Sequence, residues 1–189
     1  EITKVIMDAN NDPDCTGIIT WMHTFSPSKM WIRGLSLLQK PYLHINTQYN
    51  KSIPWDKIDM DYMNLHQSAH GDREHGFIGT RMNIPRKVVV GHWSDETVVK
   101  KIGSWMRSAI GACESKKLKV LRLSDNMRNV AVTEGDKVEA EIKFGWSVNH
   151  WAIGDLVSRM DEVTDEQIDA QMDSYAKDYE IATEDTDAV

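Results

Sequence analysis

The order of helices and strands along the chain constrains the fold more than any other feature of the sequence. Short segments rich in β-branched residues predict strands at residues 17–22, 42–47, 87–91 and 118–123. Segments with helical apolar periodicity separate them. Parallel strands need such helical crossovers, because the chain has to return to the end of the sheet where the previous strand started before the next strand begins. We therefore predict an α/β fold built on a parallel sheet with flanking helices.

Capping residues mark helix starts at two places. Ser26 followed by Pro27 predicts a helix start, because Ser is a favoured N-cap and Pro fits the first helical position. Thr164 and Gln167 match a capping box at a second start. Further helices are predicted at residues 2–9, 56–83 and 94–111. The last helix carries an apolar stripe that we expect to pack against other elements: Ile168, Met172, Tyr175 and Tyr179.

The chain divides into two predicted domains, residues 1–116 and 117–189. Residues 111–117 are small and polar, which is typical of a domain boundary. The first predicted element is a helix, whereas sheets of this kind normally open with a strand, so we expect the first strand–helix unit to be missing. The second domain begins near residue 118 and is expected to be incomplete. The sequence is thus interpreted as an excerpt of a longer protein, with an unpaired sheet edge.

Composition excludes several classes of protein. The 189 residues carry 22 basic and 29 acidic side chains, and residues 155–189 hold 12 of the acidic ones. The rest of the chain is nearly neutral without a strong basic patch, which argues against nucleic acid as the partner. No apolar run approaches the roughly 18 residues of a membrane span, so no membrane partner is expected. Cys15 and Cys113 are expected to be free thiols of a cytoplasmic protein.

The loops after the predicted strands indicate what the chain can bind, because open parallel sheets bind ligands at the carboxyl ends of their strands. These loops are polar or aromatic, and none carries a glycine-rich phosphate motif. Amide, hydroxyl and imidazole groups beside aromatic rings suit a small polyol better than a nucleotide. His23 follows the first strand directly, and it either lines this crevice, caps the next helix or bonds a loop carbonyl.

The densest polar cluster lies at residues 65–75. His66 and His70 are four residues apart, so on a continuous helix they would share a face, as the two ligands of a zincin site do. Gln67 stands where that motif needs a glutamate, so a surface or interface histidine pair is the favoured alternative. His70 is also a candidate hydrogen-bond donor to a substrate, and Gly71 would let a ligand or another chain come close.

Other residues keep two interpretations each. Phe25 is either a core aromatic or part of a pocket wall. Met127 lies in a polar loop, where it either lines a pocket or fills a gap. Asp125 beside it is more simply explained as a turn or cap residue. Most of the seven tryptophans have apolar neighbours and are predicted to be core residues.

Several motifs together carry a resemblance to the L-arabinose isomerase family. The motifs occur in order at residues 21–31, 53–56, 63–65, 68–71, 91–93, 103–107, 125–128 and 135–138. The stretch WMHTFSPSKMW is one example, and SAHG, DNMR and GDKV are others. The resemblance runs from the first helix to about Leu156, and many motifs in the same order make it far more specific than one short pattern.

The resemblance implies a Rossmann-like N-terminal domain followed by the start of a similar central α/β domain, in a cytoplasmic homo-oligomer. Members of the family interconvert L-arabinose and L-ribulose with a divalent metal, usually Mn²⁺, and many also convert D-galactose into D-tagatose. Two carboxylates can move the proton between neighbouring carbons while a metal polarises the oxygens. In the family the two glutamates and the histidine ligands lie beyond the position of Val189, so no catalytic residue or metal ligand is assigned here.

The resemblance does assign substrate contacts. The histidine of the Ala-His-Gly motif, His70 here, reaches into the active site of the neighbouring subunit. The methionine of the Asp-Asn-Met-Arg motif, Met127 here, lines the pocket, and Phe25 lies near the site. The isolated chain is expected to be inactive.

Two alternatives stay open on the sequence alone. The first is a non-catalytic sugar-binding or sensor module of the same fold. The second is a redox or nucleotide-binding α/β protein, which the missing phosphate loop and the missing Cys-x-x-Cys motif disfavour.

Overall fold

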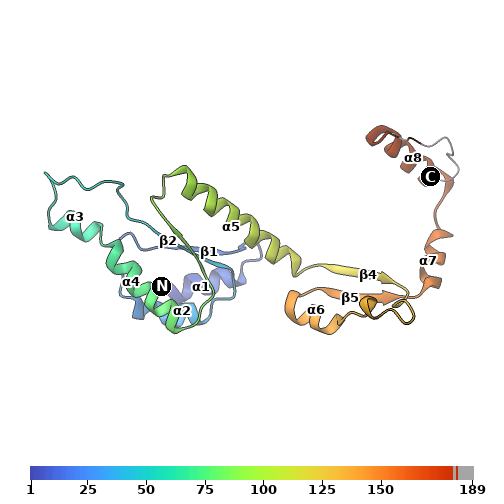
Figure 1. Cartoon of the computed structure of the whole chain (residues 1–189), viewed down its shortest axis with the longest axis horizontal. Helices are drawn as coiled ribbons and strands as arrows, with labels where there is room; N and C mark the ends of the chain where they lie inside the picture. The colour runs from blue at the N-terminus through green and yellow to red at the C-terminus, as the bar shows by residue number, and fades with distance from the viewer. Residues whose placement is uncertain (181, 183–189) are drawn as a thin grey trace. The chain divides into compact units, whose positions relative to one another are not determined.

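Parallel strands and flanking helices form two compact units, Glu1–Lys116 and Lys117–Val189 (Figure 1). The computed structural model describes residues 1–180 and 182. Every strand pair in the described residues is parallel, and helices connect the strands. The predicted α/β fold class is therefore confirmed.

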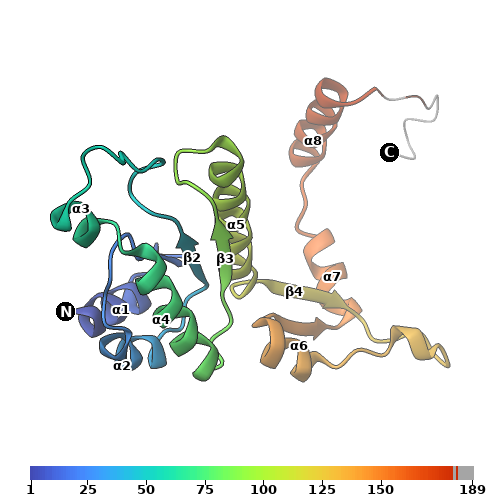
Figure 2. The same ribbon diagram turned by 60° about the vertical axis from the view of Figure 1, so that its left-hand side comes forward.

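The first unit holds a three-stranded sheet in the order β1-β2-β3. Figure 2 shows β2 beside β3. Its elements are α1 (Ile2–Asn11), β1 (Ile18–Trp21), the 3-10 helix η1 (Ser28–Trp31), α2 (Ile32–Ser36), β2 (Tyr42–Asn46), α3 (Met60–Leu65), α4 (Ser68–Arg81), β3 (Lys87–Val90) and α5 (Glu96–Ser115). In the register of the sheet, Ile18 of β1 lies opposite Tyr42, and Leu43 lies opposite Lys87 of β3. The carboxyl ends of the three strands therefore share one edge.

Side chains alternate along the central strand β2 and separate the two faces of the sheet. Leu43 is fully buried and forms an apolar core with Val89 and Val98. Ile102 and Trp105 of α5 pack against this core, because α5 presents an apolar stripe at helical spacing. One face of the sheet is thus closed by ordinary hydrophobic packing.

The helix α5 also reaches the start of β1. A Cβ atom on Gly17 would lie 2.9 Å from the Trp105 ring and 3.5 Å from the Ala109 Cβ, so the backbone before β1 approaches the helix closely. Further along α5, the Cys113 Sγ lies 3.3 Å from the Thr16 carbonyl oxygen. The last helix of this unit therefore packs against its first strand.

The predicted helix start at Ser26 and Pro27 is wrong. Pro27 has ψ 106°, which is extended, and the helix begins at Ser28 as a 3-10 turn. The Ser26 hydroxyl is used elsewhere, since it accepts a hydrogen bond from the Trp31 indole N–H at 3.0 Å. The α-helix proper begins only at Ile32.

The predicted helix over residues 56–83 is two helices, α3 and α4. The first begins at Met60, where the Asp59 carboxylate accepts from the Tyr62 backbone N–H at 2.8 Å. It ends at His66, whose backbone (φ −118°, ψ 42°) is not helical. The two histidines four residues apart, His66 and His70, therefore do not lie on one continuous helix. The helix that follows β3 also differs from its prediction, since it runs to Ser115 rather than to about residue 111.

The second unit holds a two-stranded parallel sheet. Its elements are β4 (Lys119–Leu123), η2 (Ala131–Thr133), α6 (Lys137–Phe144), β5 (Ser147–Trp151), α7 (Ile153–Met160) and α8 (Asp165–Asp178). Asp136 caps the start of α6, and Gly145 ends it with the left-handed φ of 75° that glycine adopts without strain. The capping box predicted at Thr164 and Gln167 is confirmed at the start of α8.

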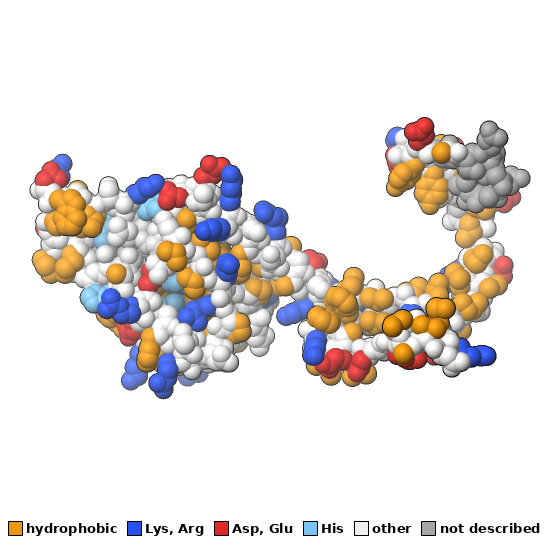
Figure 3. Space-filling model, in the orientation of Figure 1, with side chains coloured by type: hydrophobic (Ala, Val, Ile, Leu, Met, Phe, Trp, Pro, Cys, Tyr) orange, Lys and Arg blue, Asp and Glu red, His pale blue; other side chains and the backbone are white. Residues whose placement is uncertain are grey.

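Two predictions of buried apolar groups are wrong. The stripe on α8 lies at the surface, with Ile168 50% and Tyr179 69% exposed. Apolar spacing predicts which face of a helix can be buried, but not whether another element covers that face. Figure 3 shows hydrophobic side chains gathered on the surface of the second unit. Most of the seven tryptophans were predicted to be core residues, but none is fully buried. Three are exposed, Trp55, Trp93 and Trp151, and the other four are half-buried.

No helix within residues 1–180 is both long enough and apolar enough to cross a bilayer.

Two glycines on α4 give a matched test of its packing. A Cβ on Gly71 would lie 2.5 Å from the Thr24 carbonyl oxygen, whereas a Cβ on Gly76 would meet no atom within 4 Å. We predict that Gly71→Ala destabilises the chain by roughly 1–3 kcal/mol, because the helix has to move away from the loop. Gly76→Ala should stabilise it by roughly 0.5–1 kcal/mol, because alanine favours the helix. Urea unfolding followed by circular dichroism measures both, and equal effects would contradict the close approach.

Candidate functional site

Aromatic side chains tie together the loops at the carboxyl ends of the first unit's strands. The Trp21 indole N–H donates to the Thr47 carbonyl at 2.8 Å, and the Trp93 indole N–H donates to the Tyr49 carbonyl at 2.9 Å. The Trp21 and Tyr49 rings stack with their centroids 6.2 Å apart. This edge of the sheet is therefore aromatic and polar, with indole N–H groups already satisfied by loop carbonyls.

His23 does not stand free in the crevice. Its Nδ1 lies 3.3 Å from the carbonyl oxygen of Leu65, the last residue of α3, so it contacts a helix end rather than a loop carbonyl. Its ring meets the Trp21 ring edge-on at 5.6 Å. Next to it, the Thr24 hydroxyl donates to the Asn64 carbonyl. These contacts hold the loop after β1 against the end of α3.

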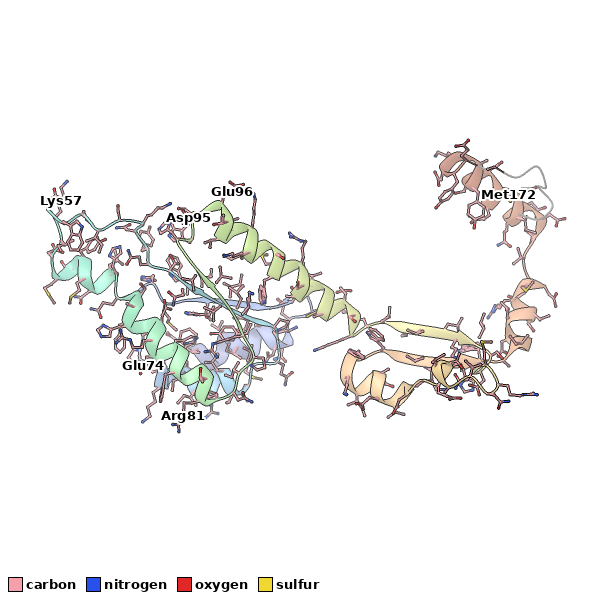
Figure 4. The ribbon with its side chains drawn as sticks, in the orientation of Figure 1. Lys57, Glu74, Arg81, Asp95, Glu96 and Met172 are labelled. Atoms are coloured by element: carbon pink, nitrogen blue, oxygen red, sulfur yellow. The ribbon has the colours of Figure 1, made fainter. Side chains whose placement is uncertain are left out.

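The structure brings together two of the predicted site residues, Phe25 and His70. Their ring centroids lie 6.2 Å apart at an angle of 73°, an edge-to-face contact between the loop after β1 and the first turn of α4. Both side chains are exposed, so Phe25 is not a core aromatic. Together with Arg73, Glu74 and Phe77 they line a surface groove of about 350 Å³. We call these five residues the α4 groove; Figure 4 labels Glu74 on the helix.

The α4 groove has the chemistry of a site for a polar ligand with an apolar face. The rings of Phe25 and Phe77 offer apolar surface, and the imidazole, guanidinium and carboxylate of the other three residues offer hydrogen bonds. Gly71 lets α4 lie directly on the Thr24 carbonyl, next to Phe25. The groove thus lies where α4 meets the loop after β1.

The face of α4 that contacts the sheet is polar. Its buried residues contain no aliphatic side chain: Ser68, Gly71, Asp72, His75 and Gly79. Opposite this face lie Tyr42 and His44 of β2 and Thr20 of β1, which are buried as well. Hydrogen bonds therefore take much of the role that apolar packing has on the α5 face.

Five of these side chains form one continuous series of hydrogen bonds, which we call the buried polar chain: Asp72, His44, Thr20, Tyr42 and His75. The Asp72 Oδ1 lies 2.5 Å from the His44 Nε2, and the His44 Nδ1 lies 2.8 Å from the Thr20 Oγ1. Thr20 and Tyr42 share a hydrogen bond of 2.9 Å between their hydroxyls, and Tyr42 bonds the His75 Nε2. The series therefore starts and ends on α4.

The buried polar chain contains a carboxylate, an imidazole and a hydroxyl in the order of a hydrolase triad. Thr20 is only 8% exposed, and its hydroxyl already bonds both Tyr42 and His44. A substrate cannot reach this oxygen, so the arrangement is structural rather than nucleophilic.

Burial shifts the pKa values of two members of the buried polar chain, His75 and Tyr42. It lowers the pKa of His75 to about 4, and the neighbouring His44 and Arg86 charges act in the same direction. Burial also raises the pKa of Tyr42. At pH 7 the bond between Tyr42 and His75 therefore joins a neutral phenol and a neutral imidazole.

Sequence analysis missed the buried polar chain. Two signals in the sequence could have indicated it. Tyr42 and His44 alternate with apolar residues along β2, and Asp72 and His75 lie one turn apart on α4. The partners are 28 and 33 residues apart in sequence, so only the pairing of strand and helix shows that the two signals meet.

Met127, the third predicted site residue, lies in the second unit, in the loop after β4. It is 66% exposed, and its backbone N–H donates to the Thr133 hydroxyl at 3.2 Å. Asp125 in the same loop accepts from the Asn126 backbone N–H at 2.8 Å, which lowers the pKa of Asp125 and supports its interpretation as a turn residue. The role of Met127 as a pocket residue stays a prediction.

The residues that the structure describes do not assemble a metal centre. Within them, no three His, Cys, Asp or Glu side chains lie close enough to hold a metal ion. His66 ends α3, and its Nδ1 lies 2.8 Å from the Tyr62 carbonyl oxygen, so the zincin-like pair with His70 is not formed. The described side chains therefore do not fit the Mn²⁺ that the resemblance implies, and ligands elsewhere stay a prediction.

Comparison with known sequences decides the family. Residues 1–117 match the L-arabinose isomerase N-terminal domain, and residues 119–188 match the L-arabinose isomerase central domain. The chain belongs to the L-arabinose isomerase family. The resemblance seen in the sequence motifs is therefore confirmed.

Curated L-arabinose isomerases are similar to the chain over nearly its whole length. The protein of Clostridium beijerinckii is 61% identical over 180 residues, which is 95% of this chain and 37% of that protein. The proteins of Thermotoga petrophila and Geobacillus stearothermophilus are both 59% identical, over 95% and 96% of the chain. The chain thus spans little more than a third of the length of these L-arabinose isomerases.

The ionisation of His75 predicts how stability depends on pH. Its pKa of about 4 in the folded chain is below the ordinary value of about 6.5, so the unfolded chain binds the proton first. The stabilisation is complete above about pH 6.5 and is lost as the pH falls towards 4. Between pH 7 and pH 4.5 the free energy of unfolding should fall by about 2 kcal/mol more than in the variant His75→Gln.

Urea unfolding of the chain and of the His75→Gln variant at the two pH values measures this difference. All other titrating groups are common to both proteins and cancel in the comparison. The same pH-dependent loss in both proteins would show that His75 is not buried as a neutral group.

Proposed function

We propose that the protein containing this chain is an L-arabinose isomerase that interconverts L-arabinose and L-ribulose. One observation carries the proposal: proteins of that name are about 60% identical to the chain over 95% of its residues. The whole-protein reaction needs residues that the described part of this chain does not provide, because it holds no metal centre and the α4 groove has no pair of carboxylates. We therefore assign substrate contacts and subunit surfaces to this chain.

The α4 groove supports a role in sugar binding. A sugar ring has an apolar face, which packs on aromatic rings such as Phe25, and hydroxyls that bond imidazole groups such as His70. The exposed position of His70 at the first turn of α4 agrees with a side chain that reaches the active site of a neighbouring subunit. Met127 is proposed to line the same kind of pocket from the loop after β4.

We also propose the location, assembly, metal and second substrate pair that the family resemblance implies. The parent enzyme is a cytoplasmic homo-oligomer that shares its active site between subunits and uses Mn²⁺, with D-galactose and D-tagatose as a second substrate pair. Its two catalytic glutamates and its histidine ligands lie beyond residue 189. A non-catalytic sugar-binding module of the same fold is the competing function, and activity of the complete protein distinguishes the two.

Turnover by the complete protein tests the proposal directly. We predict that the protein encoded by the full coding sequence, supplied with Mn²⁺, converts L-arabinose into L-ribulose, and that the 189-residue chain does not. A colorimetric assay for the ketose measures both. Sugar binding by the complete protein without any ketose would favour the binding module, and metal-dependent turnover by the isolated chain would overturn the assignment of catalysis to residues outside it.

The variant His70→Ala in the complete protein tests the substrate contact. We expect KM for L-arabinose to rise by about tenfold, because one hydrogen bond to the sugar is worth roughly 1 kcal/mol or more, while kcat changes less. Size-exclusion chromatography should show an unchanged oligomer. Thr80→Ala, at an exposed position of the same helix, serves as the control. Unchanged kinetics in His70→Ala would remove His70 from the site.

A further inference from the structure

The attachment of α4 to the sheet is unusual in its chemistry. A helix normally binds a sheet through aliphatic side chains, whereas the buried residues of α4 are small or polar. Burying a carboxylate and an imidazole costs desolvation energy that a pair of apolar side chains would avoid. The polar pair restricts the orientation of the helix, because a hydrogen bond requires a defined geometry and a hydrophobic contact does not.

The buried polar chain holds α4 at two points. Asp72 bonds His44 at one end, and His75 bonds Tyr42 at the other, one helical turn further along. Thr20 joins the two ends within the sheet by its bonds to both His44 and Tyr42. Two attachments one turn apart fix both the position of the helix along its axis and its rotation about that axis.

The helix α4 also carries the residue that faces the sugar in the proposed function. His70 precedes Asp72 by two residues and lies in the first turn of α4, on the exposed side. Between them Gly71 contacts the loop that carries Phe25. Any rotation of α4 therefore changes the distance between His70 and Phe25, and with it the shape of the α4 groove.

We propose that Asp72 is a positioning residue: paired with His44, it fixes α4 and thereby sets where His70 lies for sugar binding. This inference rests on the function proposed above. Asp72 does not touch the sugar, because it is buried against β2 and only 8% exposed. Its influence passes through the helix backbone to His70.

The hydrogen bond between His44 and Asp72 suggests two variants that weaken this bond to different degrees. A carboxylate only accepts hydrogen bonds, so the His44 Nε2–H donates to the Asp72 Oδ1. Asp72→Asn keeps a carbonyl oxygen that accepts this bond, whereas Asp72→Ala removes the acceptor. The control is Thr80→Ala, which deletes an α4 side-chain hydrogen bond, from Arg86, on the exposed side of the helix.

The test is a double-mutant cycle in the complete protein. We expect Asp72→Ala to raise KM for L-arabinose by about fivefold to tenfold, with Asp72→Asn closer to the wild type and Thr80→Ala unchanged. In a His70→Ala background, Asp72→Ala should add less than about twofold, since the group it positions is gone. A merely structural role would lower the amount of folded enzyme and leave KM unaltered. If Asp72→Ala fails to fold, Asp72→Asn is compared in both backgrounds.

Two results would overturn the inference. One is an unchanged KM in folded Asp72→Ala, and the other is an equal rise of KM with and without His70. If the wild-type complete protein shows no isomerase activity, the proposed function fails, and hydrogen exchange measured by mass spectrometry then tests the attachment itself. Faster exchange of residues 67–77 in Asp72→Ala, with residues 96–112 unchanged, would support the fixing of α4, whereas no difference would reject it.

Discussion

The hydrogen bonds between α4 and the central strand connect the candidate site of the first unit to its sheet. The α4 groove, the exposed position of His70 and the close contact at Gly71 all require the helix to lie in one orientation. The bonds that Asp72 and His75 make to the sheet hold the helix at two points. Each member of the series makes at least one of these bonds, and a buried polar group that loses its partner is costly.

The two faces of the sheet are covered by helices through different kinds of contact. On the α5 face, Leu43, Val89 and Val98 form an apolar core whose stabilisation is not directional. On the α4 face, Tyr42 and His44 require partners at defined positions. The side of the sheet that carries the candidate site is thus the side that fixes orientation, while the opposite side supplies general stability.

The sequence predicted the parallel sheet well, because residues such as Leu43 and Val89 lie in short apolar segments between amphipathic helices. It did not predict the end of α3 at His66, since no Gly or Pro lies there and the loop contact from His23 comes from 42 residues away. Phe25 and His70 were proposed separately by resemblance, and only the fold shows that they touch. Side chains that meet across a strand and a helix leave no local signal that periodicity can detect.

The contact between α5 and the start of β1 has a consequence for how the chain is made. The Cys113 Sγ and the Thr16 carbonyl are 97 residues apart in sequence but 3.3 Å apart in space. During synthesis β1 emerges early, yet the helix that covers its start emerges after every other element of the first unit. Contacts of such long sequence separation form slowly, because the intervening chain must first be ordered. Until α5 has emerged from the ribosome, the apolar face of this sheet is open to solvent and to chaperones.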